Sequence, residues 1–178
     1  IPKLETPIDV TVENIKVGDK ETVVVTVPED AKGNVTIEID GVKYTSEIKD
    51  GKATFEIQNL TAGNKTVAVD YAGDNNYTGN HTTANFTVSK RASQVDVTGD
   101  VIVVGENATV TVNVTSGATG YVVVRVDGQN YTINLTQSRG SVTITGLKNA
   151  TYPITATYLG DDKYLGNVSQ TANVTVNK

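Results

Sequence analysis

The most frequent chemical motif in this chain is the triplet Asn-x-Ser/Thr, the acceptor of N-linked glycosylation. Thirteen of the sixteen asparagines begin such a triplet, whereas a chain of this composition would give about three by chance. They are Asn34, Asn59, Asn64, Asn76, Asn80, Asn85, Asn107, Asn113, Asn130, Asn134, Asn149, Asn167 and Asn173. We predict that several carry glycans in the native source, which would make the protein a glycoprotein. An unmodified strand face rich in Asn and Thr would also produce triplets, because positions i and i+2 share a face.

A loop that contains Gly-Asp occurs twice, as Gly73-Asp74 and as Gly160-Asp161-Asp162. Its carboxylates, from Asp74, Asp161 and Asp162, are weak candidates for calcium ligands. A hard cation needs about six to eight oxygen ligands, and these loops offer too few. Aspartate is also an ordinary turn residue that bonds to its own backbone. We therefore expect a structural role for these aspartates, and no metal or other cofactor.

Catalytic chemistry has no candidate residues in this sequence. There is no cysteine, and the only histidine, His81, aligns with Val168 in the second half of the chain. No pair of acidic residues lies within an apolar segment, so neither nucleophilic nor general acid–base catalysis is indicated. We predict that the chain is not an enzyme.

Charge and hydropathy limit the partners. The net charge is −5 and the pI is about 4.8, with no cluster of Lys or Arg, which argues against nucleic acid. No apolar run approaches the roughly 18 residues that a membrane-spanning helix requires. The chain begins with Ile1 and contains no methionine, so we expect it to be a segment of a longer polypeptide.

The two halves of the chain repeat one another. A shift of 87 positions aligns residues 17–80 with residues 104–167, with 21 identities in 64 positions and no gap. This period suits a whole small domain rather than a solenoid turn. We predict one domain over residues 1–90 and a second over 91–178, joined by a polar linker over residues 89–93.

Apolar residues alternate with polar ones almost throughout both halves, as in strands with one buried face. The pattern predicts seven strands per domain, over residues 8–15, 21–27, 34–40, 42–48, 52–58, 65–72 and 82–88, and then 95–104, 108–114, 121–127, 129–135, 140–145, 152–158 and 170–176. Asp40-Gly41 and Asp127-Gly128 lie between alternating runs and predict two-residue hairpin turns. The expected fold is all-β: two tandem antiparallel β-sandwiches.

The pattern Tyr-x-Gly-Asp-x-x-Tyr, which starts at Tyr71 and again at Tyr158, follows a Leu and a Val-rich Asp-Gly hairpin in both halves. Together these residues resemble the immunoglobulin-like repeats of large surface and adhesin-like proteins of bacteria and methanogenic archaea. Tyr152 resembles the tyrosine corner of such sandwiches, in which the phenol bonds to a nearby backbone group. The first half has Lys65 at that position, so we expect a less tightly pinned turn there. The regular placement of Tyr71 and Tyr158 favours core positions over a sugar-binding platform.

The resemblance implies an extracellular, cell-surface location, in bacteria or archaea, and a non-catalytic role. We expect stalk or spacer repeats that project a distal binding region, with neighbouring repeats of the same polypeptide as partners. The alternative is that the repeats themselves form an adhesion module that binds glycans or proteins on a host or partner cell. Residues found in only one copy, such as Tyr121 and Arg125, would then be the first candidates for binding.

Overall fold

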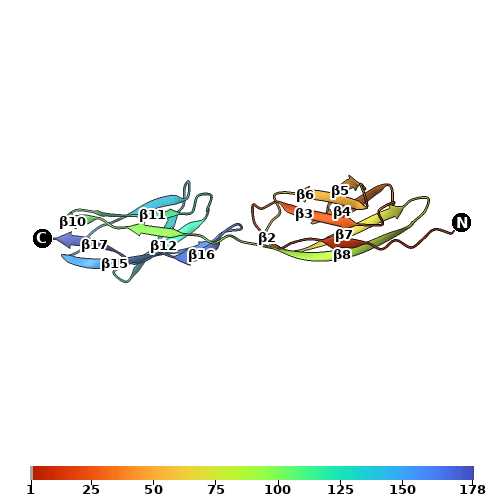
Figure 1. Ribbon diagram of the computed structural model, residues 1–178. Coiled ribbons are helices and arrows are strands. Elements are labelled where there is room, and N and C mark those ends of the chain that lie inside the picture. The colour runs from red at the N-terminus through yellow and green to blue at the C-terminus, as the bar shows by residue number, and fades with distance from the viewer. Residues whose placement is uncertain (1) are drawn as a thin grey trace. The chain divides into compact units, whose positions relative to one another are not determined.

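The computed structural model describes residues 2–178, and these residues form strands without any helix. The chain divides into two compact units between Ser89 and Lys90, each with its own sheets (Figure 1). The predicted all-β class with two tandem sandwiches is confirmed. Within the described part of the chain, no helix has the length and apolarity that a membrane span requires.

The described part of the first unit, residues 2–89, contains eight strands. They are β1 (Asp9–Thr11), β2 (Ile15–Lys16), β3 (Glu21–Thr26), β4 (Asn34–Ile39), β5 (Val42–Glu47), β6 (Lys52–Ile57), β7 (Gly63–Gly73) and β8 (Thr78–Ser89). A small sheet has the order β1-β3-β6, and a larger sheet has the order β2-β8-β7-β4-β5. The core lies between the two sheets, where the apolar residues of each alternating strand meet.

The second unit repeats this plan. Its strands are β9 (Val95–Thr98), β10 (Val101–Val103), β11 (Ala108–Val114), β12 (Tyr121–Val126), β13 (Gln129–Asn134), β14 (Arg139–Ile144), β15 (Ala150–Gly160), β16 (Leu165–Val168) and β17 (Ala172–Asn177). The small sheet is β14-β11-β9, and the larger sheet is β10-β17-β15-β12-β13 with β16 paired to β15. Each unit has its own buried apolar cluster, which contains Tyr71 in the first and Tyr158 in the second, both 1% exposed.

The hairpin turns have the backbone conformation that Asp-Gly favours. Asp40 and Gly41 have φ angles of 52° and 78°, and Asp127 and Gly128 have φ angles of 50° and 75°. Positive φ at both central residues is the requirement of a type I′ turn, whose twist matches that of the flanking strands.

Three predicted strands differ from the structure by more than two residues, and one strand was not predicted. The single strands expected over 8–15 and 95–104 are each divided into two short strands, and the two members of each pair join different sheets. The strand expected from residue 82 begins four residues earlier, at Thr78. In the second unit β16 precedes β17, although no strand was expected between residues 158 and 170. These strands are short or polar, so hydrophobic alternation predicts them poorly.

Candidate functional site

The Gly-Asp loop of unit 1 ties the β7–β8 hairpin to the segment before β4. The Asp74 Oδ1 atom accepts hydrogen bonds from the N–H groups of Asn76 and Tyr77, both at 2.7 Å. Its Oδ2 atom accepts one from the Lys32 N–H at 2.8 Å, and the Tyr71 hydroxyl donates to the Lys32 carbonyl at 2.7 Å. The bond from Lys32 is the main reason that the pKa of Asp74 is lowered.

Unit 2 contains the same set of bonds. Asp161 Oδ1 accepts from the N–H groups of Lys163 and Tyr164, at 2.8 and 2.7 Å. Its Oδ2 accepts from the N–H and the hydroxyl of Thr119, both at 2.9 Å, and the Tyr158 hydroxyl donates to the Thr119 carbonyl at 2.7 Å. Partial burial opposes ionisation of Asp161, but these hydrogen bonds outweigh it and lower its pKa to about 2. Burial, followed by the Asp161 charge, raises the pKa of Tyr158 to about 12.

These hydrogen bonds show that Asp74 and Asp161 have a structural role within their units. Both oxygens of each carboxylate already accept N–H donors. Asp162, the third candidate for calcium, lies exposed beside Asp161 without joining this network. No group of three or more His, Cys, Asp or Glu side chains with metal-binding geometry occurs within residues 2–178. The repeated loop therefore fastens two segments that are distant in sequence.

The segment that enters each unit is fixed to the same hairpin. The Leu4 N–H donates to the Asn76 carbonyl and the Leu4 carbonyl accepts from the Thr78 N–H, both at 2.9 Å. In unit 2, the Arg91 N–H donates to the Lys163 carbonyl at 2.9 Å, and the Arg91 carbonyl accepts from the Leu165 N–H at 2.8 Å.

The predicted five-residue linker over 89–93 is therefore wrong. The Ser89 carbonyl accepts a hydrogen bond from Val17 within unit 1, and Arg91 is already bonded within unit 2. Ser93 also belongs to unit 2, because its hydroxyl donates to the Leu165 carbonyl at 2.6 Å. Only Lys90 lies between the last of these bonds in unit 1 and the first in unit 2.

The second strand of each unit runs parallel to its last strand. In unit 1, β2 pairs with the end of β8 through Ile15–Val88 and Lys16–Ser89. The Val17 N–H extends this pair with a 2.9 Å bond to the Ser89 carbonyl. In unit 2, β10 pairs with β17 over three residues, and the Val104 N–H adds a 2.8 Å hydrogen bond to the Asn177 carbonyl. The remaining strand pairs of both units are antiparallel.

Tyr152 and Lys65 occupy equivalent positions and fasten the same turn differently. The Tyr152 hydroxyl donates to the carbonyl of Lys148, four residues earlier, at 2.9 Å. Lys65 is 7% exposed, and its ammonium donates to the Asp40 carboxylate at 2.7 Å. It also donates to the hydroxyl of Thr61, again four residues earlier, at 2.8 Å. The looser turn expected at Lys65 is therefore wrong, because an ion pair and a second hydrogen bond replace the tyrosine.

The thirteen asparagines of the Asn-x-Ser/Thr triplets are all exposed. In three of them the amide nitrogen, to which a glycan would attach, donates a hydrogen bond to a backbone carbonyl. Asn80 donates to Thr6 at 2.8 Å, Asn149 to Val176 at 2.6 Å and Asn167 to Ser93 at 2.8 Å. The structure records no such bond for the amide nitrogens of the other ten.

Glu21 is a buried acid that the sequence analysis missed. It is 1% exposed at the start of β3, and its Oε2 atom is buried without a hydrogen-bond partner. Its Oε1 atom accepts a hydrogen bond from the Thr22 N–H at 3.1 Å and a longer one from the backbone N–H of Glu13 at 3.4 Å. Burial raises the pKa of Glu21. The signal was present in the sequence, because Glu21 is in phase with Val23 and Val25.

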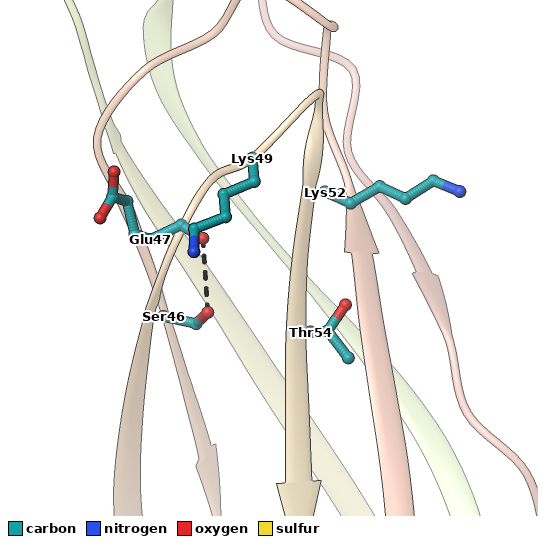
Figure 2. A pocket seen from close by; sticks show the side chains of 5 residues that line it. All are labelled: Ser46, Glu47, Lys49, Lys52 and Thr54. Atoms are coloured by element: carbon teal, nitrogen blue, oxygen red, sulfur yellow. Dashed lines mark hydrogen bonds between the residues drawn. The ribbon is translucent and has the colours of Figure 1, made fainter.

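The surface hollow shown in Figure 2 lies between β5 and β6. Ser46, Glu47, Lys49, Lys52 and Thr54 line it. The Ser46 hydroxyl donates to the Glu47 carbonyl at 3.4 Å, and the Lys52 side chain extends away from the Glu47 carboxylate. His81 is exposed on β8 and does not line this hollow.

Comparison with solved structures gave matches over nearly the whole chain. The titin domains Z1Z2, solved in complex with telethonin, align over 99% of this chain and 98% of theirs, with a TM-score of 0.54 and 16% identity. The Yersinia pseudotuberculosis adhesin InvE aligns over 96% of this chain and 59% of its own, with a TM-score of 0.45 and 16% identity. Fibronectin(III)-like modules of Clostridium thermocellum CbhA align over 97% and 94%, with a TM-score of 0.41 and 13% identity. At 16% identity the likeness to the titin domains concerns the fold alone.

A search of curated proteins gave no match. The family described as "Bacterial Ig-like domain (group 3)" matches residues 8–89 and again residues 95–177, which correspond to the two structural units. The chain therefore belongs to the bacterial Ig-like domain family and contains two tandem copies of that domain.

Proposed function

We propose that the two units are spacer repeats of a larger cell-surface protein, and that they hold a distal region away from the cell while under tension. The observation that carries this proposal is the parallel pairing of the second strand with the last strand in each unit, β2 with β8 and β10 with β17. Tension between the chain ends of a unit acts along these two neighbouring strands in opposite directions. The hydrogen bonds between them are then loaded together in shear, so several must break at once.

The entering segments support the same function. Leu4 and Arg91 are each held by two backbone hydrogen bonds to the hairpin that follows the Gly-Asp loop. The aspartate and the tyrosine hydroxyl of that loop in turn bond to the segment before β4 or β12. Force that enters through the chain is thus shared by strands that are distant in sequence. Both copies keep this arrangement, as expected if each repeat has the same task.

Single-molecule stretching by the chain ends tests the proposal. Val17→Pro removes the N–H that bonds to Ser89, and Val104→Pro removes the one that bonds to Asn177. We expect each substitution to lower the unfolding force of its own unit and to leave the other unit unchanged. Val17→Ala and Val104→Ala keep the N–H and control for the lost side chain. Equal forces for the proline and alanine variants would contradict the proposal.

We also propose that the surface carries glycans and faces the outside of the cell. The exposed positions of the thirteen triplet asparagines support this, because a bulky glycan needs such positions. Asn80, Asn149 and Asn167 should be occupied least, because their amide nitrogens are engaged in the folded unit. Glycopeptide mass spectrometry of protein from the native source measures this. If all thirteen asparagines are unmodified, the protein is not glycosylated. If glycan occupancy is highest at Asn80, Asn149 and Asn167, their hydrogen bonds do not limit glycosylation.

A further inference from the structure

The outer face of the larger sheet in unit 2 exposes large apolar side chains. Tyr121, Leu159 and Val168 are 42%, 62% and 56% exposed. Their sequence neighbours Val122 and Tyr158 are buried, so alternation places Tyr121 and Leu159 on the face that points away from the core. An exposed group of this kind marks an interaction surface more often than isolated apolar residues do.

Strand register brings these side chains together. Val123 pairs with Thr157, which pairs with Val168, so the three form one row across β12, β15 and β16. Because Val122 pairs with Tyr158, Tyr121 and Leu159 are neighbours in the next row. We call Tyr121, Val123, Leu159 and Val168 the apolar face of unit 2.

The equivalent face of unit 1 has the opposite character. The positions of Tyr121, Val123, Leu159 and Val168 correspond to Asn34, Thr36, Ala72 and His81. An open depression of about 590 Å³ lies here, lined among others by Thr36, Glu38, Lys43, Ala68, Asp70 and His81. We call these six residues the hollow face of unit 1.

Charge also differs between the two faces. Glu38 on the hollow face is replaced by Arg125 beside the apolar face, and Asp70 is replaced by Thr157. Arg125 donates one bond to Asn130 at 3.1 Å and retains further N–H donors. The difference in charge extends to the whole units. Residues 1–89 contain 14 acidic and 8 basic residues, whereas residues 90–178 contain 6 acidic and 7 basic residues.

We propose that the apolar face of unit 2 docks on the hollow face of unit 1 in a second copy of this chain. The depression above Ala68 receives an apolar side chain, and Arg125 approaches Glu38 or Asp70. Both faces belong to the same kind of sheet, and sheets stack face to face at about 10 Å. Charge complementarity selects the partner. Two apolar faces would bring Arg125 against Arg125, whereas the hollow face keeps a net negative charge, because Glu38 and Asp70 outnumber Lys43. This lateral association goes beyond the spacer function.

Analytical ultracentrifugation of the unglycosylated 178-residue chain, from micromolar to millimolar concentration, tests the proposal. Asn34, Asn130 and Asn134 border the two faces, so glycans at these sites would complicate the measurement. We expect association that increases with concentration and weakens as salt is added. A monomer at every concentration would overturn the proposal.

Charge reversal identifies the two faces. Arg125→Glu alone and Glu38→Arg alone should each weaken association about tenfold or more, and the two together should restore much of it. Tyr121→Asn, which introduces the residue found in unit 1, should also weaken it. Val101→Thr alters a residue that is 73% exposed on β10, outside both faces, and should have no effect.

Three other outcomes would also overturn the proposal. Association that Tyr121→Asn abolishes but Glu38→Arg leaves intact would show that two apolar faces meet. Double reversal that restores nothing would exclude contact between these charges. Association that Val101→Thr abolishes would place the contact elsewhere.

Discussion

Replacement of Glu21 by glutamine should stabilise unit 1 at neutral pH. Glu21 is 1% exposed and its Oε2 atom has no hydrogen-bond partner, so ionisation places an unsatisfied charge inside the sandwich. Glutamine has the same shape, retains an oxygen for the Thr22 N–H and carries no charge. Unit 2 has Ala108, fully buried, at the equivalent position, so the fold does not need an acid there.

The expected gain is about 1–2 kcal/mol at pH 7, because a buried unsatisfied charge costs more than a buried neutral amide. The gain should depend on pH with a definite sign. Burial, with a smaller repulsion from Glu13, raises the pKa of Glu21 above 4.5. A carboxyl group whose pKa is raised on folding stabilises the folded state fully at pH values below its unfolded pKa. That contribution is lost as pH rises through its folded pKa. Wild type and Glu21→Gln should therefore be equally stable at low pH and diverge above 4.5.

Native-state hydrogen exchange by mass spectrometry can measure this for each unit. Peptides from β4 and β7 report the free energy of unfolding of unit 1, and those from β12 and β15 provide the internal control in unit 2. Both proteins are measured across the acidic to neutral range, and the difference between them isolates Glu21 from other titrating groups. A destabilised variant at neutral pH, or a difference that does not change with pH, would refute the reasoning.

The other substitutions test the bonds that fasten each unit. Asp161→Ala should destabilise unit 2 by about 1–2 kcal/mol in chemical denaturation at neutral pH. Because the pKa of Asp161 is lowered to about 2, this difference should shrink as pH falls through that value, and a constant difference would argue against it. Lys65→Met should cost unit 1 about 1 kcal/mol, because the bonds to Thr61 and to the half-exposed Asp40 are lost, whereas Lys65→Tyr should restore part of that loss by copying the corner of unit 2; equal melting temperatures for both variants would contradict this. Gly73→Ala should unfold unit 1 in circular dichroism, because Gly73 has a φ of +90° and a Cβ would lie 2.7 Å from a backbone nitrogen; wild-type melting would refute it.

The repeat and the alternation were sufficient to predict two all-β sandwiches and the Asp-Gly turns. They failed at the first strand of each unit, because alternation shows which face of a strand is buried but not which sheet the strand joins. The chain crosses from β1 to β2 between Thr11 and Ile15, and the Asn14 side chain accepts a bond from the Thr87 N–H on the way. Such a crossing leaves little trace in hydropathy.

The candidate site was predictable in part. Asp74 and Asp161 were correctly placed in turns, but their bonds to Lys32 and Thr119 connect residues 42 positions apart and have no local signature. The bonds that hold Leu4 and Arg91 are between backbone atoms, which any residue type supplies. Lys65, by contrast, is in phase with the buried Val67 and could have been predicted to point inward.

The most direct test of the spacer function compares two directions of force on the same chain. In one experiment the chain is stretched by its ends, which loads β2–β8 and β10–β17 in shear. In the other, handles attached to the cysteines of Tyr121→Cys and Asn134→Cys pull a cross-strand pair apart. This force opens the β12–β13 hairpin one hydrogen bond at a time. We expect a clearly higher unfolding force for stretching by the ends, with one step for each unit and roughly 250–300 Å of chain released per step. An equal or lower force for stretching by the ends would contradict the account.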